Sequence, residues 1–322
     1  AERPLDVRKV GGSSPPPPTK ILYSMKSASI FFLIFLSLAA FFSRFYNLSY
    51  PSKVVFDESH FGLYATKYLW RQYYFDIHPP LGKMMFAAVA FFTGAKPGFD
   101  FAVNSDYGNF KFFPLRATSA FFGCLLVLLV YFLAKEVGLS EKSAFLVSFL
   151  VLFDNAILVQ SRLILLDIFL VFFIFLSLYL FLLERKATPF SKKWLFLNFL
   201  LGISLGCAIS IKLTGFGILA TVLVGNFLNL SFKNKKLFFS KIFFILFLPL
   251  FLYFLFYLIH FAILSKPCFE NCGAVLDEFL EKSLPPFLKK LIEASGKKYS
   301  QTIFSLFNSV SYTHLTLPTN RE

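Results

Sequence analysis

The sequence is poor in charge and in cysteine. Charged residues make up 16% of the chain, and only 18 of the 322 residues are acidic. Four cysteines are too few for a disulfide framework, and Cys124 and Cys207 lie inside apolar runs, as small packing residues do. Cys268 and Cys272 flank Phe-Glu-Asn and would pair only in an oxidising lumen, while a zinc site there lacks two further ligands nearby. No cluster has metal-ligand spacing, so we expect no metal site.

Apolar residues dominate instead. Hydrophobic residues make up 57% of the chain and phenylalanine alone contributes 48 of 322. This composition excludes a disordered or collagen-like chain, and it exceeds the usual apolar share of a soluble protein. The net charge of +14 would suggest nucleic acid in a soluble protein. Here the basic residues cluster between apolar runs, which is the positive-inside pattern of a membrane protein, and we expect no nucleic-acid partner.

Long apolar runs predict an all-α membrane protein with about seven spans. A spanning helix needs about 20 largely apolar residues. The predicted spans are 28–45, 113–134, 143–158, 163–183, 194–211, 213–230 and 241–264. The third is interrupted by Asp154 and Asn155, and the fifth and sixth are separated only by Ile211 and Lys212, as in a tight hairpin or a broken helix.

Charge then orients these spans. Residues 1–27 form a polar, basic, proline-rich tail that we expect to be disordered and cytoplasmic. With the tail on that side, the cytoplasmic connections collect most of the basic residues, whereas the two short opposite connections carry only Arg162 and Lys212. The segment 46–112 then lies on the lumenal side. Within it, 58–72 and 80–93 have helical apolar spacing but are too short to span, so we expect two helices in the membrane interface.

The lumenal segment also concentrates acidic residues at the membrane surface. Asp57 and Glu58 follow the first span closely, and Asp76 and His78 come next, before two prolines. Carboxylates beside a low-dielectric boundary are costly unless they are paired or used. Asp57 is a candidate general base for a hydroxyl acceptor, with Asp76 and His78 orienting it or the substrate. Simpler alternatives are a helix N-cap for Asp57 and a proline-led helix entry after His78.

Four further charged residues lie near the predicted span ends. Arg116 begins the second span and would either snorkel to the surface or bind a lipid-linked phosphate. Arg162 and Asp167 are more readily an internal ion pair than ligand contacts, and Lys212 is most simply an interfacial residue at the hairpin.

Several motifs, in one order, resemble a known family. The segment FDESHFGLYATKYLWRQYYFDIHPPLGKMM resembles the first lumenal loop of eukaryotic protein O-mannosyltransferases, which are dolichyl-phosphate-mannose–protein mannosyltransferases of the GT-C class. PLRATSAFFG, SRLILLDIFLVFF and GCAISIKLTGF are similar to later family segments, so the likeness covers residues 28–265. The resemblance implies a multi-span GT-C bundle in the endoplasmic reticulum membrane.

The resemblance also implies a reaction. Mannose would pass from dolichyl phosphate mannose to a Ser or Thr hydroxyl of a secretory protein, with inversion at the anomeric carbon. Asp57 matches the family's base, while Glu58, Asp76, His78 and Arg116 match positions that shape the site. Arg116 is then the candidate for the phosphate, and Arg162, Asp167 and Lys212 are weaker candidates. Membrane lipid surrounds such an enzyme, no cofactor is implied with certainty, and family members commonly form homo- or heterodimers.

The carboxyl-terminal part departs from the family pattern. Full-length members carry a lumenal β-trefoil (MIR) domain, and 266–310 is expected to be the lumenal segment that begins that region. Residues 311–322 lack the phenylalanine bias and resemble a translated sequencing adapter, so we expect a non-native tail and a fragment of a longer enzyme. Two other functions stay open: another polyprenyl-phosphate-sugar transferase, and a non-enzymatic transporter or scaffold subunit.

Overall fold

A computed structural model describes residues 27–227 and 234–266. The predicted tail 1–27, the segment 266–310 and the tail 311–322 lie almost entirely outside these residues, as do Cys268 and Cys272. The described part is helical, without a named strand. Its elements are α1 Ser27–Phe45, α2 Glu58–Trp70, α3 Leu81–Phe92, α4 Phe113–Glu136, α5 Glu141–Phe153, α6 Asn155–Gln160, α7 Asp167–Arg185, α8 Lys192–Ile211, η1 Leu213–Gly215, α9 Phe216–Phe227, α10 Lys235–Ile242, η2 Phe243–Phe247 (a π-helical stretch) and α11 Leu248–Ile263.

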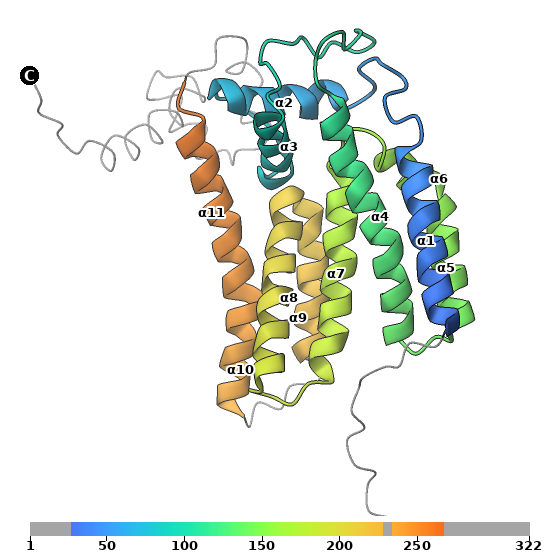
Figure 1. Cartoon of the computed structure of the whole chain (residues 1–322). Helices are drawn as coiled ribbons and strands as arrows, with labels where there is room; N and C mark the ends of the chain where they lie inside the picture. The colour runs from blue at the N-terminus through green and yellow to red at the C-terminus, as the bar shows by residue number, and fades with distance from the viewer. Residues whose placement is uncertain (1–26, 228–233, 267–322) are drawn as a thin grey trace, which may run out of the picture.

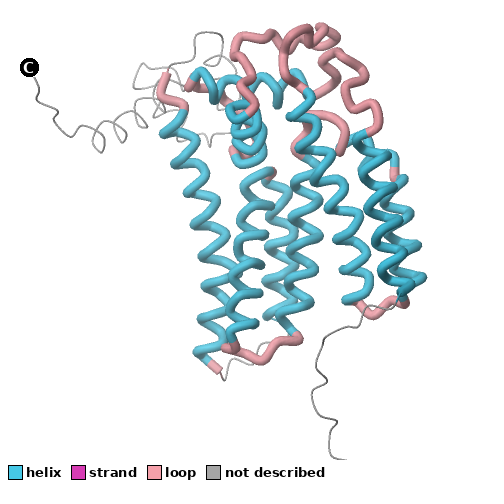
Figure 2. The backbone as a smooth tube through the Cα atoms, viewed as in Figure 1, coloured by secondary structure: helices cyan, strands magenta, loops and turns pink. Residues whose placement is uncertain are grey.

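The long helices run side by side, and α2 lies across one end of the bundle (Figure 1). Most of the longer loops gather at that same end (Figure 2). Within the described residues, four helices are long and apolar enough to cross a membrane: α4, α7, α8 and the continuous helix Lys235–Ile263. The apolar parts of α1 and α9 are shorter, so the predicted count of seven spans stays a prediction.

The predicted third span, 143–158, is wrong as one helix. It is divided into α5 and α6 at Asp154, whose backbone is extended (φ −59°, ψ 121°). The Asp154 side chain accepts a hydrogen bond from the backbone N–H of Ile157 at 2.9 Å and so caps α6. A side chain that offers the backbone this alternative partner favours a new helix start over a continuous helix.

The predicted fourth span, 163–183, begins later than the apolar pattern suggested. Residues 163–166 are not helical, although Ile164, Leu165 and Leu166 are at most 2% exposed. The helix α7 starts only at Asp167. The buried turn before it brings the N–H of Ile164 to the bundle end covered by α2, where it reaches Glu58.

Helices are present where the two interfacial helices were predicted. α2 has 13 residues and α3 has 12, both short of the length needed to span. The buried residues of α2 include Phe61, Ala65 and Tyr68. The position of α2 and α3 relative to a membrane is not tested by the structure and stays a prediction.

Close packing of α8 against η2 and α11 depends on small residues. A Cβ atom at Gly202 would lie 2.4 Å from the carbonyl oxygen of Phe244, and one at Gly206 would lie 2.7 Å from a methyl carbon of Leu252. Because backbone atoms cannot yield as side chains do, glycine at 202 permits this approach. The centre of the bundle consists of α4, α7 and α8. The helices α2 and α3 cover one end of it (Figure 1).

Candidate active site

The candidate site lies at the end of the bundle covered by α2. Glu58, in the first turn of α2, is completely buried together with Arg116, in the first turn of α4. The Arg116 Nε donates to Glu58 Oε1 at 2.8 Å, and Nη2 donates to Oε2 at 2.8 Å. Glu58 also accepts from the backbone N–H of Val55 at 3.0 Å, the hydroxyl of Tyr107 at 3.1 Å and the N–H of Ile164 at 3.1 Å. One carboxylate therefore joins α2, α4, the turn before α7 and residues 55 and 107 of the loops on either side of α2 and α3.

The rest of the Arg116 guanidinium is also occupied. Its remaining N–H groups donate to the backbone carbonyls of Leu48, Pro51 and Lys53, at 3.3, 2.8 and 3.1 Å. The guanidinium carbon lies 4.8 Å from the ring centre of Phe112. All five donors are thus used inside the protein. Neither a snorkelling nor a phosphate-binding Arg116 agrees with this arrangement; its geometry is that of a buried anchor for residues 48–58.

Asp57 differs from its neighbour. It is half-buried and, within the described residues, its carboxylate makes no hydrogen bond or ion pair. Its side chain does not cap α2, so the simpler alternative from the sequence is wrong. Phe56 precedes it in the left-handed region (φ 50°), a conformation that non-glycine residues rarely adopt and that concentrates at functional sites.

Asp76 is neutralised by a residue that sequence reasoning missed. The ammonium of Lys83, in α3, forms an ion pair with Asp76 and donates to the backbone carbonyl of His78 at 2.6 Å. Lys83 is 1% exposed and Asp76 is 11% exposed. The same ammonium lies 5.8 and 5.7 Å from the ring centres of Tyr64 and Tyr74. A lysine inside a short apolar helix was the available signal, since such a cation is costly to bury without a partner.

The predicted ion pair between Arg162 and Asp167 is wrong. Asp167, at the start of α7, pairs instead with Lys212, just after α8, at 2.7 Å. Arg162 donates to the carbonyls of Ser43 and Arg44 at 2.9 and 3.1 Å, and it also reaches those of Tyr46 and Asn47. It therefore caps the carbonyl end of α1, where a cation is favoured.

His78 is half-buried between the two ion pairs. Burial lowers the pKa of its imidazole, and the charges of Asp76, Lys212, Lys83 and Asp167 act on the same ring. The ring also lies 6.1 Å from that of Phe61. The structure thus gathers Asp76, His78, Asp167 and Lys212 from the predicted set, whereas Glu58 and Arg116 form a separate buried pair.

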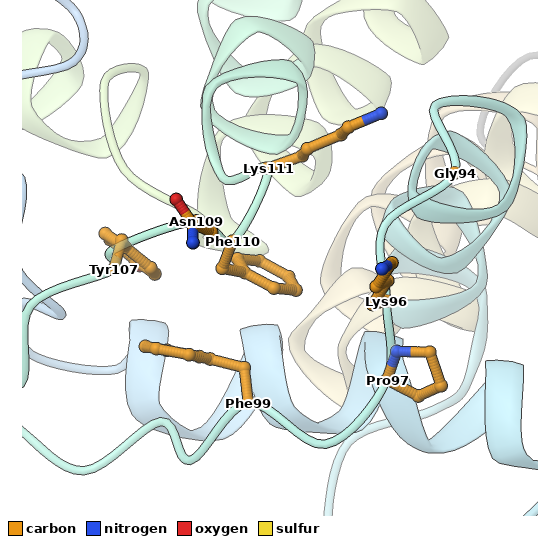
Figure 3. A pocket seen from close by; sticks show the side chains of 8 residues that line it. All are labelled: Gly94, Lys96, Pro97, Phe99, Tyr107, Asn109, Phe110 and Lys111. Atoms are coloured by element: carbon orange, nitrogen blue, oxygen red, sulfur yellow. The ribbon is translucent and has the colours of Figure 1, made fainter.

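A hollow of about 390 Å³ lies in the loop between α3 and α4 (Figure 3). Phe99, Tyr107 and Phe110 line it together with Gly94, Lys96, Pro97, Asn109 and Lys111. Tyr107 is the connection to the site, because its hydroxyl donates to Glu58. Within the described residues, no group of three or more His, Cys, Asp or Glu side chains is placed to hold a metal ion.

Comparison with known proteins agrees with this architecture. Residues 34–265 match the family model described as dolichyl-phosphate-mannose-protein mannosyltransferase. The chain belongs to this family. It is 35% identical over 258 residues to dolichyl-phosphate-mannose–protein mannosyltransferase 1 of Candida albicans, covering 76% of this chain and 29% of the relative. It is 31% identical to protein O-mannosyl-transferase 2 of Danio rerio, covering 74% of this chain and 33% of the relative.

The fold is the GT-C helical bundle that the resemblance implied. The structure is similar to that of the Saccharomyces cerevisiae protein O-mannosyltransferase Pmt1–Pmt2 complex bound to the sugar donor, with a TM-score of 0.69 and 30% identity. That match covers 76% of this chain and 35% of the other. The archaeal oligosaccharyltransferase AglB shares the fold at 15% identity and a TM-score of 0.54. The chain spans about a third of the length of the curated relatives it matches.

Proposed function

We propose that this chain is the amino-terminal part of an enzyme that transfers mannose from dolichyl phosphate mannose to Ser or Thr hydroxyls of secretory proteins. One observation carries the assignment of the base. Of the three carboxylates at 57, 58 and 76, Glu58 and Asp76 are paired with buried cations, and Asp57 is the one without a cation partner among the described residues. An unpaired carboxylate retains its capacity to accept a proton.

The reaction follows from that assignment. Asp57 accepts the proton of the acceptor hydroxyl as its oxygen forms a bond to the anomeric carbon of mannose. The bond from that carbon to the phosphate oxygen breaks with inversion, and dolichyl phosphate leaves with the electron pair. A leaving phosphate needs a cation close by. Lys212 is the cation we assign to it, because it is 19% exposed and lies near His78, whereas Arg116 is fully occupied.

Asp167 accepts a hydrogen bond from Lys212, whose side chain stays 19% exposed. His78, kept neutral by burial, would hydrogen-bond to the donor, with Asp76 and Lys83 fixing its segment. Glu58 and Arg116 are positioning residues in this proposal, because they fix the loop that carries Asp57. The enzyme would lie in the endoplasmic reticulum membrane with its amino terminus in the cytoplasm, paired with a related mannosyltransferase.

The test is a transfer assay. The full-length gene product is expressed in microsomes and supplied with labelled dolichyl phosphate mannose and a Ser/Thr-containing peptide. We expect labelled mannosyl-peptide. Label that passes instead to a lipid or glycan acceptor would favour another lipid-phosphate-sugar transferase, and the absence of any transfer by correctly folded protein would overturn the proposal.

A further inference from the structure

Lys83 is a buried cation that makes more contacts than the neutralisation of its charge requires. Its ammonium contacts a carboxylate, a backbone carbonyl and the faces of two tyrosine rings, which come from α2 and from the segment between α2 and α3. The two rings, of Tyr64 and Tyr74, are stacked on each other at 4.2 Å with an interplanar angle of 7°. The helix α2 and the segment between α2 and α3 therefore converge on one nitrogen atom.

Lys241 is a second buried lysine, and it serves as the comparison for a lysine whose charge is balanced by a buried carboxylate. Lys241 pairs with Glu184 at the opposite end of the bundle, and its ammonium lies 5.4 Å from the ring centre of Trp194 (Figure 1). That lysine also meets a carboxylate and an aromatic ring. Lys83 has in addition a hydrogen bond to the backbone carbonyl of His78, which joins it to the chain and not only to a counter-charge.

The bond to the His78 carbonyl has a directional consequence. A backbone carbonyl fixed 2.6 Å from a buried ammonium restricts the dihedral angles of the residue that carries it. His78 is followed by Pro79 and Pro80, whose rings restrict the backbone from the other side. The backbone at His78 is therefore restricted from both directions, and the charges of Lys212 and Asp167 act on its imidazole ring.

We propose that Lys83 is a positioning residue of the transfer reaction: by binding the Asp76 carboxylate and the His78 carbonyl together, it orients the His78 imidazole toward the site around Lys212. This proposal rests on the proposed function and adds to it a residue and a role. Lys83 itself, at 1% exposed, does not touch the substrate.

The test separates positioning from charge balance. Lys83→Met alone leaves the Asp76 carboxylate buried without its partner, so loss of stability is expected for either role. The informative variant is the double Lys83→Met/Asp76→Asn in the full-length protein, which removes both charges. We expect its thermal unfolding to return toward that of the wild type, while kcat in the mannosyl-peptide assay stays lower by at least about tenfold, as for a misplaced reacting group.

The matched control is Lys241→Met/Glu184→Gln, which removes a similar buried pair from the far end of the bundle. We expect it to keep kcat close to that of the wild type, because the pair lies far from the candidate site. An equal loss of kcat in the control would overturn the proposal, as would a Lys83→Met/Asp76→Asn double variant with wild-type kcat.

If the double variant does not accumulate in the membrane, the single variant Lys83→Arg tests the positioning role instead. Arginine keeps the charge, but its planar fork cannot place a point charge between the carbonyl and the two rings. A reduced kcat at unchanged unfolding temperature supports positioning, and a wild-type kcat overturns it. A wild-type protein that transfers no mannose would overturn the proposed function along with this inference, whereas an active wild type with unaffected variants would overturn this inference alone.

Discussion

Glu58 and Arg116 are joined by two parallel hydrogen bonds of 2.8 Å, and neither side chain is exposed to solvent. The pair connects the first turn of α2 to the first turn of α4 across 58 positions of sequence. Asp57 is the residue immediately before Glu58, so the position of the candidate base depends directly on this pair. Two adjacent carboxylates consequently have different surroundings: Glu58 is paired and buried, and Asp57, the base in the proposed function, is half-buried without a cation partner among the described residues.

We expect Asp57→Asn to abolish transfer while the protein folds normally. The side chain makes no hydrogen bond in the described structure, so an isosteric amide removes only the negative charge and the capacity to accept a proton. Loss of a general base lowers kcat by about 10²–10⁴-fold. The control is Asp100→Asn, an exposed carboxylate in the same lumenal segment. Retention of more than about a tenth of the wild-type kcat would show that Asp57 is not the base.

We expect Glu58→Gln to lower the stability of the protein. The amide leaves the fully buried Arg116 guanidinium without its counter-charge, and breaking such a pair costs about 3–5 kcal/mol. We expect a lower unfolding temperature and less protein in the membrane, with a partial recovery in Glu58→Met/Arg116→Met. Lys186→Met is the comparison, because that lysine is 62% exposed and an exposed pair contributes about 0–1 kcal/mol. Equal unfolding temperatures for Glu58→Gln and the wild type would contradict this account.

We expect Lys212→Met to weaken binding of the donor, dolichyl phosphate mannose. A hydrogen bond to a charged group contributes about 1.5–3 kcal/mol, which corresponds to roughly a ten- to hundredfold rise in donor KM. Donor KM is measured with acceptor peptide in excess, and Lys96→Met, an exposed lysine of the lumenal segment, is the control. An unchanged donor KM in Lys212→Met would remove this lysine from the site.

The orientation predicted from basic residues can be tested directly. The connection between α7 and α8 lies at the end of the bundle opposite α2 (Figure 2). We expect an epitope inserted at residue 188 to be digested by protease added to sealed microsomes, and one at residue 104 to be protected. The reverse pattern would invert the topology and place the candidate site on the cytoplasmic side.

Gly202→Ala should separate α8 from η2. The added methyl would meet a backbone carbonyl oxygen at 2.4 Å, and such overpacking costs about 1–3 kcal/mol. Gly217→Ala is the matched substitution, because nothing lies within 4 Å of its added methyl and alanine favours a helix by about 0.8–1 kcal/mol. In detergent, Gly202→Ala should unfold at a lower temperature than the wild type and Gly217→Ala at a higher one. The opposite order would contradict the packing described.

The candidate site was only partly accessible to sequence reasoning. The acidic residues and His78 were identified because acidic residues are few in this sequence and these lie close together soon after an apolar run. Their partners were not. Nothing in the spacing indicates that Arg116 pairs with Glu58, that Lys212 pairs with Asp167, or that Lys83 holds Asp76, because each contact joins segments brought together by helix packing.

The sequence by itself determined the class of fold. Apolar runs of spanning length fix helices, since backbone groups must be hydrogen-bonded within the segment, and the order of motifs fixed the family. The tertiary structure alone decided which charges are neutralised and which carboxylate has no cation partner among the described residues. The physical reason is that helix formation depends on near neighbours in the chain, whereas the state of a buried charge depends on whatever distant side chain the packing places within about 3 Å of it.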